Sequence, residues 1–114
     1  RFTKKEHVEG NHRDYRAEKQ LIITPETKLD GIYIINDDYA CTLKVDGIQM
    51  NVYSNYDSLV VYTQNKLASH DLSNAVKDTM HAGIAIECQK PQSDLPLLKK
   101  DEVYDFYTKY EFVF

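Results

Sequence analysis

The clearest hydrophobic pattern in the chain lies at residues 39–52, where polar and apolar side chains alternate. A period of two is typical of a β-strand with one buried face. The two alternating runs are separated by Asp46-Gly47, a preferred sequence for a two-residue type I′ turn, because both positions need positive φ. The sequence therefore predicts a β-hairpin. Counting outward from the turn gives these opposite pairs: Val45 with Ile48, Leu43 with Met50, Cys41 with Val52, Lys44 with Gln49, and Thr42 with Asn51. The same count places Tyr39 on the face of Cys41.

Two further apolar runs, GIYII and SLVVYT, flank the hairpin. Asp37-Asp38 is expected to turn the chain before the hairpin, and residues 55–57 are expected to turn it again afterwards. With both turns tight, the four runs form an antiparallel meander from Gly31 to Thr63. The opposite pairs predicted across the first turn are Ile34 with Cys41 and Ile32 with Leu43.

The remaining elements complete an α+β prediction. Strands are expected near residues 21–24 and 83–88, and a long C-terminal strand near 104–114, although residues 101–110 also fit a helical period. Residues 70–82 switch to a helical period, with apolar positions on one face and Gly83 placed to end the helix. The predicted fold is an antiparallel sheet of five to seven strands with one packed helix near 70–82. Residues 1–18 form a polar N-terminal arm, and residues 19–114 form one domain.

Composition narrows the choice of partners. The 114-residue chain has a net charge of −4, which disfavours nucleic acid, and no apolar run is long enough to span a membrane. It contains nine tyrosines and no tryptophan, and tyrosine is suited to half-buried positions with a wet hydroxyl. The chain begins with Arg1 rather than methionine, so we expect an upstream segment to have been removed. We therefore predict a secreted or periplasmic protein.

Cys41 and Cys88 are both expected on the apolar faces of strands. Neither cysteine has a second Cys or His at the spacing of a zinc site, and a core-facing thiol lacks the setting of a nucleophile. A disulfide or two buried thiols remain, and the even count favours the disulfide. It would close a loop of about 47 residues and stabilise the fold by ~4 kcal/mol in the chain-entropy model.

The candidate partner-binding residues are tyrosines and acidic turn residues. Tyr33 and Tyr53 fall on the meander face opposite Cys41, and Tyr62 joins them if the turn at Tyr56 permits. Tyrosine gives a large amphipathic contact area at low entropy cost, although the helix or the last strand could instead cover this patch. The predicted partner-binding set is Tyr33, Tyr53, Tyr62, Asp37 and Asp38.

Candidate catalytic groups are few, and we predict no catalytic residue, metal or cofactor. The four histidines, at positions 7, 12, 70 and 81, form no metal-spaced pair. A nuclease could still use His12 with another histidine as general base and acid. The acidic pairs Asp37-Asp38 and Asp101-Glu102 could serve a glycosidase, although turn chemistry already explains Asp37-Asp38.

Three functional hypotheses follow. The first is a small extracytoplasmic protein-binding module, namely an immunity or inhibitor protein that occludes the active site of a toxin or lytic enzyme, with acidic charge steering it to a basic target. Cys41, the Asp46-Gly47 turn and Cys88 resemble the disulfide-stapled β-sandwiches of small fungal effectors, over less than half of the chain. That resemblance implies a secreted pathogen effector. The third hypothesis is a small nuclease or glycosidase.

Overall fold

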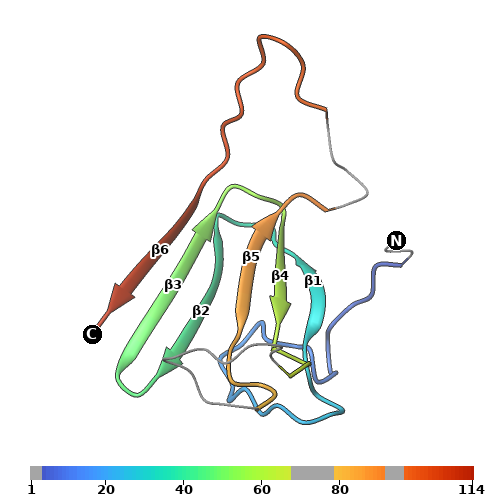
Figure 1. Cartoon of the computed structure of the whole chain (residues 1–114), viewed down its shortest axis with the longest axis vertical. Coiled ribbons are helices and arrows are strands. Elements are labelled where there is room, and N and C mark those ends of the chain that lie inside the picture. The colour runs from blue at the N-terminus through green and yellow to red at the C-terminus, as the bar shows by residue number, and fades with distance from the viewer. Residues whose placement is uncertain (1–3, 68–78, 92–96) are drawn as a thin grey trace. The chain divides into compact units, whose positions relative to one another are not determined.

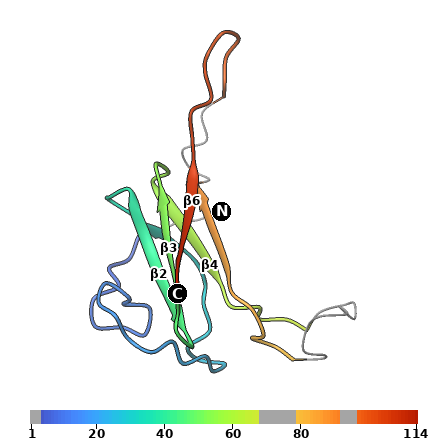
Figure 2. The ribbon, with the colours of Figure 1, turned by 90° about the vertical axis from the view of Figure 1, so that its left-hand side faces the viewer.

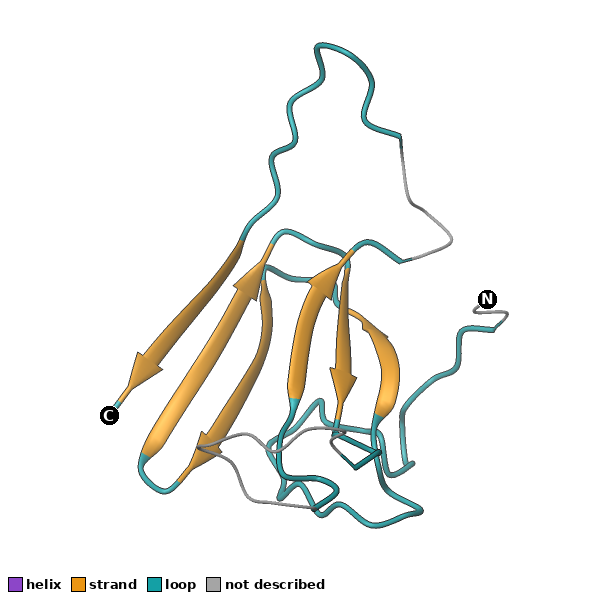
Figure 3. Ribbon diagram, viewed as in Figure 1, coloured by secondary structure: helices purple, strands orange, loops and turns teal. Residues whose placement is uncertain are grey.

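The computed structural model of the chain describes residues 4–67, 79–91 and 97–114. Six β-strands and no helix lie in these residues (Figures 1 and 3). One antiparallel sheet has the order β1-β4-β5, with β1 at Asp30–Ile34, β4 at Ser58–Tyr62 and β5 at Ala85–Gln89. The other has the order β2-β3-β6, with β2 at Tyr39–Val45, β3 at Ile48–Ser54 and β6 at Thr108–Val113.

The α+β prediction is wrong, because the described residues are all-β. Residues 70–78 of the predicted helix lie outside the described residues, and residues 79–82 are turn and irregular backbone. His81 has a left-handed φ of 63° and donates its backbone N–H to the carbonyl of Gln64 at 2.9 Å. Its ring Nδ1 also lies 2.7 Å from the carbonyl of Thr63. These bonds are directed to residues 63–64 rather than to a preceding helical turn.

The chain divides into two compact units. Within the described residues, the first comprises Ile32–Val60 and Glu87–Phe114, and the second comprises the chain up to Gly31 together with Val61–Ile86. The whole of the β2-β3-β6 sheet belongs to the first unit. Figure 2 shows β2, β3 and β6 side by side from a second direction.

The predicted β2–β3 hairpin is confirmed, with five of the observed Cα pairs matching the count from the turn. Asp46 and Gly47 both adopt positive φ, at 45° and 81°, as a type I′ turn requires. The prediction for Tyr39 is wrong. A bulge between Tyr39 and Cys41 places Tyr39 opposite Tyr53, because one extra residue in a strand reverses the faces of the residues before it.

The predicted meander is also wrong, since β1 and β4 pair with each other in the β1-β4-β5 sheet, apart from β2 and β3. The backbone N–H of Ile35 donates to the carbonyl of Asp57 at 3.0 Å, which continues the contact between the end of β1 and the start of β4. The carbonyl of Asp38 accepts the N–H of Ser54 at 2.7 Å. Residues 35–38 thus cross from one sheet to the other instead of forming a tight turn. The predicted pairs of Ile34 with Cys41 and Ile32 with Leu43 do not form.

The smaller strand predictions have mixed outcomes. The strand expected near 83–88 is confirmed as β5, and β6 confirms the 108–113 part of the expected C-terminal strand. Residues 104–107 are irregular. Residues 21–24 form no strand, because the carbonyl of Thr24 closes a turn by accepting the N–H groups of Thr27 and Lys28, at 3.2 and 2.9 Å.

Each unit buries a few apolar side chains together with fully bonded hydroxyl groups. Val52 and Leu59 are buried in the first unit, and Leu29 and Val61 in the second. Every buried side-chain nitrogen or oxygen in the described part of the chain has a hydrogen-bond partner. The buried hydroxyls bond as follows: Ser54 to the carbonyl of Tyr107, Ser58 to the carbonyl of Gln89, and Thr63 to the backbone of Leu29. Paired in this way, buried hydroxyls avoid a desolvation cost of roughly 1–3 kcal/mol each.

Candidate functional site

The partner-binding residues predicted from the sequence are dispersed in the structure. Tyr53 lies on β3, on the face opposite Val52 and hence opposite Cys41, as the hairpin register predicts. Tyr33 and Tyr62 lie on β1 and β4 of the other sheet, so the predicted group of three tyrosines is divided between the two sheets. Asp37 and Asp38 lie in the exposed connector before β2, where a side-chain oxygen of Asp37 accepts the N–H of Tyr39 at 3.4 Å.

The structure instead gathers polar side chains on one face of β2-β3-β6, which we call the polar face. Strand pairing places Thr42, Asn51 and Glu111 in one row across the three strands, with Tyr39, Tyr53 and Lys109 in another. Gln49 completes the set from β3. Seven side chains from three strands thus lie on one surface, although β6 is distant in sequence from the hairpin.

The side chains on this face form a series of hydrogen bonds in which the donor and acceptor of each bond can be assigned. The Thr42 hydroxyl donates its proton to Asn51 Oδ1 at 2.6 Å. The hydroxyls of Tyr39 and Thr42 are also bonded, and since Thr42 has no second proton, Tyr39 must be the donor in that bond. Asn51 Oδ1 accepts a further bond from Gln49 Nε2 at 2.8 Å, and Asn51 Nδ2 donates to Glu111 Oε2 at 3.1 Å. The series of hydrogen bonds thus runs from the Tyr39 hydroxyl to the Glu111 carboxylate.

Glu111 is the acceptor on which this network ends. Tyr53 donates its hydroxyl to Oε2 at 3.4 Å, and Lys109 Nζ lies 3.4 Å from Oε1. The hydrogen bond from Asn51 is the largest cause of a lowered pKa of Glu111, followed by the positive charge of Lys109. Glu111 is therefore held as an anion by donors from β3 and β6.

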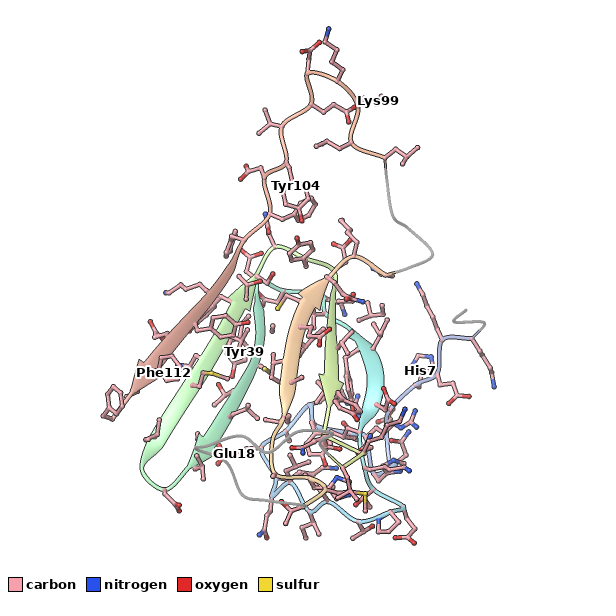
Figure 4. All side chains as sticks on the ribbon, viewed as in Figure 1. His7, Glu18, Tyr39, Lys99, Tyr104 and Phe112 are labelled. Atoms are coloured by element: carbon pink, nitrogen blue, oxygen red, sulfur yellow. The ribbon has the colours of Figure 1, made fainter. Side chains whose placement is uncertain are left out.

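Two tyrosines and a lysine form the exposed part of the polar face. The rings of Tyr39 and Tyr53 lie 5.6 Å apart and tilted by 59°, within the range of favourable aromatic pairs. Lys109 Nζ lies 4.8 Å from the centre of the Tyr53 ring, in a cation–π arrangement. Tyr39 is exposed (Figure 4), while Tyr53 is half-buried. The two rings and the Lys109 charge therefore reach solvent on the same face.

The opposite face of the same sheet is apolar and unevenly covered. Val52 on β3 has 0% of its surface exposed, whereas Phe112 on β6 is 55% exposed (Figure 4). Val45 and Ile48, at the hairpin end, are exposed as well. Clustered exposed apolar side chains are typical of surfaces that contact another macromolecule.

A second aromatic cluster ties the segment before β6 to the first unit. Tyr56 stacks on Phe106 at 4.6 Å, Tyr104 packs tilted against Phe106 at 5.1 Å, and the two tyrosine hydroxyls are hydrogen-bonded. This bond is the largest cause of a raised pKa of Tyr56. Lys90 Nζ lies 5.1 Å from the Phe106 ring centre and 2.5 Å from an oxygen of Asp57. These contacts explain the cluster as a structural anchor for residues 104–107.

Cys41 and Cys88 are free thiols in the structure, and both are half-buried. Burial raises the pKa of Cys41 to about 11, and the charge of a Cys88 thiolate contributes further. A thiol with so high a pKa is a poor nucleophile at neutral pH. The disulfide expected from the sequence stays a prediction.

The remaining candidate groups are bonded locally. His12 lies in the N-terminal arm, where its carbonyl accepts a bond from Lys19 Nζ at 3.3 Å, and His70 lies outside the described residues. Glu102 accepts the backbone N–H of Lys99 at 2.9 Å across a turn in which Asp101 has positive φ. In residues 4–67, 79–91 and 97–114, no group of three or more His, Cys, Asp or Glu side chains is placed to hold a metal ion.

Sequence reasoning placed Thr42, Gln49, Asn51 and Tyr53 on the face opposite Cys41, as the structure shows, but it counted only Tyr53 among the partner-binding residues and missed Tyr39, Lys109 and Glu111. The signal for Thr42 opposite Asn51 was present in the hairpin register, whereas the contribution of Lys109 and Glu111 required the β3–β6 pairing. The described residues contain no helix that is long and apolar enough to cross a bilayer. No protein-family model matches the sequence, and comparisons with curated proteins and with solved structures found no significant match.

Proposed function

We propose that this chain is a protein-binding domain that recognises a partner protein through the polar face of β2-β3-β6. The observation that carries the proposal is the hydrogen-bonded network that fixes two tyrosines and an ion pair on an outward face of the sheet. Tyrosine is enriched among the residues that contribute most to binding at the centres of protein interfaces.

Preorganisation is the physical reason for this choice. Binding commonly costs about 0.5–1.5 kcal/mol for each flexible side chain that becomes ordered. On the polar face, the Tyr53 ring is held between Tyr39 and Lys109, and its hydroxyl is held by Glu111. A partner would therefore meet side chains whose geometry is already set. The Glu111 and Lys109 charges add a requirement for complementary charge, which favours specificity over affinity.

An immunity or inhibitor role against a toxin or lytic enzyme belongs to this class of function and stays a prediction from composition. So do the secreted or periplasmic location and the alternatives of a pathogen effector or a small hydrolase. The net charge of −4 favours a basic partner if long-range steering contributes to association.

The test uses photo-crosslinking from two positions. A photoreactive amino acid replaces Tyr39 in one variant and Val103, which is exposed in the segment before β6, in the other. Both full-length proteins are incubated with extract and culture fluid of the source organism, and irradiated. We expect a discrete protein adduct from position 39 alone.

Specificity is checked by adding Tyr53→Ala to the position-39 variant. This change removes the ring that lies beside position 39 and the hydroxyl that bonds Glu111, so the adduct should fall at least tenfold. Adducts of equal yield from positions 39 and 103, or an adduct that survives Tyr53→Ala in a protein with unchanged circular dichroism, would contradict the proposal.

A further inference from the structure

The outer edge of β6 has the features of a strand that pairs with another strand. β6 is at the end of the β2-β3-β6 order, and no strand within the described residues pairs with its outer side. Its pairing with β3 is continuous over six residue pairs, from Gln49 with Val113 to Ser54 with Thr108, without a bulge. An unpaired, regular edge strand presents a row of backbone donors and acceptors that can extend the sheet.

The other edge of this sheet is blunted. β2 carries the bulge between Tyr39 and Cys41, and a bulge interrupts the even spacing of ladder bonds and increases the local twist. Bulges are one of the ways in which natural edge strands avoid pairing. A partner strand is thus expected at β6 rather than at β2.

The side chains of β6 favour a copy of β6 itself as that partner. On β6, the even-numbered residues lie on the apolar face and the odd-numbered residues on the polar face. Residues directly opposite each other in an antiparallel pair share a face, so two copies keep their apolar faces together only when even-numbered residues pair with even-numbered ones and odd with odd. When Tyr110 pairs with Tyr110 of a second copy, Lys109 lies opposite Glu111 in both directions. Opposite charges directly across an antiparallel pair are stabilising, and like charges are destabilising.

Neighbouring registers lack this match. A shift by two residues in one direction places Lys109 opposite Lys109 of the second copy, and a shift in the other direction places Glu111 opposite itself. The matched register also sets Phe112 opposite Thr108 and the two Tyr110 rings together on the apolar face. Phe112 and Tyr110 are 55% and 49% exposed in the single chain, so pairing would shield apolar surface as well as backbone.

We propose that two copies of this chain associate through antiparallel β6–β6 pairing centred on Tyr110, with Lys109 of each copy opposite Glu111 of the other. The result is a continuous sheet of six strands in which the two polar faces lie on the same side. The pairing follows two-fold symmetry, which is the commonest form of homo-oligomer. It extends the proposed function by doubling the recognition surface, but its own test does not need the protein partner.

Charge variants test the register. Lys109→Glu places two acidic pairs across the interface, and Glu111→Lys places two basic pairs there. Each variant alone should dissociate at least tenfold more readily than the wild-type chain in analytical ultracentrifugation. An equimolar mixture of the two variants should dimerise again, because acidic residues of one copy then face basic residues of the other. Wild-type chain that is monomeric up to millimolar concentration, or a mixture that stays monomeric while both variants are folded, would overturn the proposal.

Cysteine trapping provides a readout that does not perturb Glu111. In the Tyr110→Cys variant, the introduced thiols of two copies meet on the symmetry axis, within the Cα separation that a disulfide tolerates. Val113→Cys is the matched control, because Val113 is also 49% exposed but lies opposite Tyr107 of the second copy. With oxidised glutathione, we expect a covalent dimer from Tyr110→Cys at least tenfold faster than from Val113→Cys, with the bridge located by peptide mass spectrometry. Equal rates would refute the register, whereas loss of the position-39 adduct would bear on the proposed function alone.

Discussion

Asn51→Asp is the most direct perturbation of the polar face, since it changes an amide nitrogen into an oxygen without changing the shape of the side chain. Asn51 is 8% exposed, and its Nδ2 donates to Glu111 at 3.1 Å. The bonds that Oδ1 accepts from Thr42 and Gln49 can persist in the variant. The lost bond to a charged acceptor should lower the free energy of unfolding by about 2 kcal/mol at neutral pH, and repulsion between the facing carboxylates adds to this loss.

The two proteins should differ in the sign of their pH dependence. In the wild type, the lowered pKa of Glu111 means that its contribution is present above the unfolded value and lost as the pH falls through the lowered pKa. In Asn51→Asp, two facing carboxylates raise the pKa of the pair, because one proton relieves their repulsion. The difference in stability between the two proteins should therefore be largest near pH 7 and shrink as the pH falls toward about 4.

The assay is urea unfolding followed by tyrosine fluorescence and circular dichroism across this pH range. Glu111→Gln added to Asn51→Asp is the matched control, because the new amide can donate to the introduced carboxylate and restore the bond with its direction reversed. The double variant should recover most of the lost stability, which is a coupling between contacting residues. An Asn51→Asp protein within about 0.5 kcal/mol of the wild type, or a double variant no more stable than Asn51→Asp, would refute the assigned network.

Three further predictions concern single positions. Thr63→Val removes the hydroxyl that accepts the buried N–H of Leu29 at 2.9 Å, so it should lower the free energy of unfolding in urea by about 2 kcal/mol. Thr63→Ser keeps the hydroxyl and loses only a methyl group, so it should lower the free energy of unfolding by about 1 kcal/mol. The reverse order would contradict the assigned hydrogen bond. Gly47→Ala should lower the melting temperature by about 4 °C, because the φ of 81° at Gly47 is unfavourable for a residue with a side chain. An added Cβ meets nothing within 4 Å at Gly47 or at Gly31, so Gly31→Ala, which lacks the positive φ, should leave the melting temperature nearly unchanged. Reduced Cys41, with its pKa raised from 9.0 to about 11, should react with iodoacetamide at pH 8 roughly 100-fold more slowly than in the unfolded chain, as measured by peptide mass spectrometry. Because the unfolded chain loses this proton first, stability should also fall as the pH rises from 9 through 11, and labelling at the unfolded rate would contradict the burial of Cys41.

The sequence predicted local pairing well and long-range pairing poorly. Asp46-Gly47 sets the β2–β3 register because a two-residue turn leaves no freedom in which residues face each other. The same reasoning failed at Asp37-Asp38, where a tight turn was predicted but residues 35–38 connect β1 of one sheet to β2 of the other. The observed choice depends on the hydrogen bond from Ser54 to Asp38 and on pairing between β1 and β4, and neither appears as a local pattern.

The polar face shows why the site was harder to predict than the hairpin. The alternation in β2 placed Tyr39 with Cys41, and only the bulge before Cys41 reverses this assignment. A bulge at that point leaves no signature in the period of the sequence, because Ala40 fits either face. The pairing of Asn51 with Glu111 spans 60 positions and depends on which strand adds to β3, which is decided by tertiary packing.

The burial of Asn51 argues that the polar face is built to hold a fixed geometry. An amide on the outer face of a sheet can satisfy its hydrogen bonds with water, so stability alone does not require it to be covered. Here its oxygen accepts two side-chain donors and its nitrogen is committed to Glu111, so neighbouring side chains replace the solvent. A fully satisfied network of this kind selects one arrangement of its members, since any rotamer change breaks several bonds at once. That arrangement fixes Tyr39 on β2 and Tyr53 on β3, with Tyr53 next to Lys109 of the edge strand β6. Fixed rings lose less conformational entropy when a partner binds, so the network favours binding.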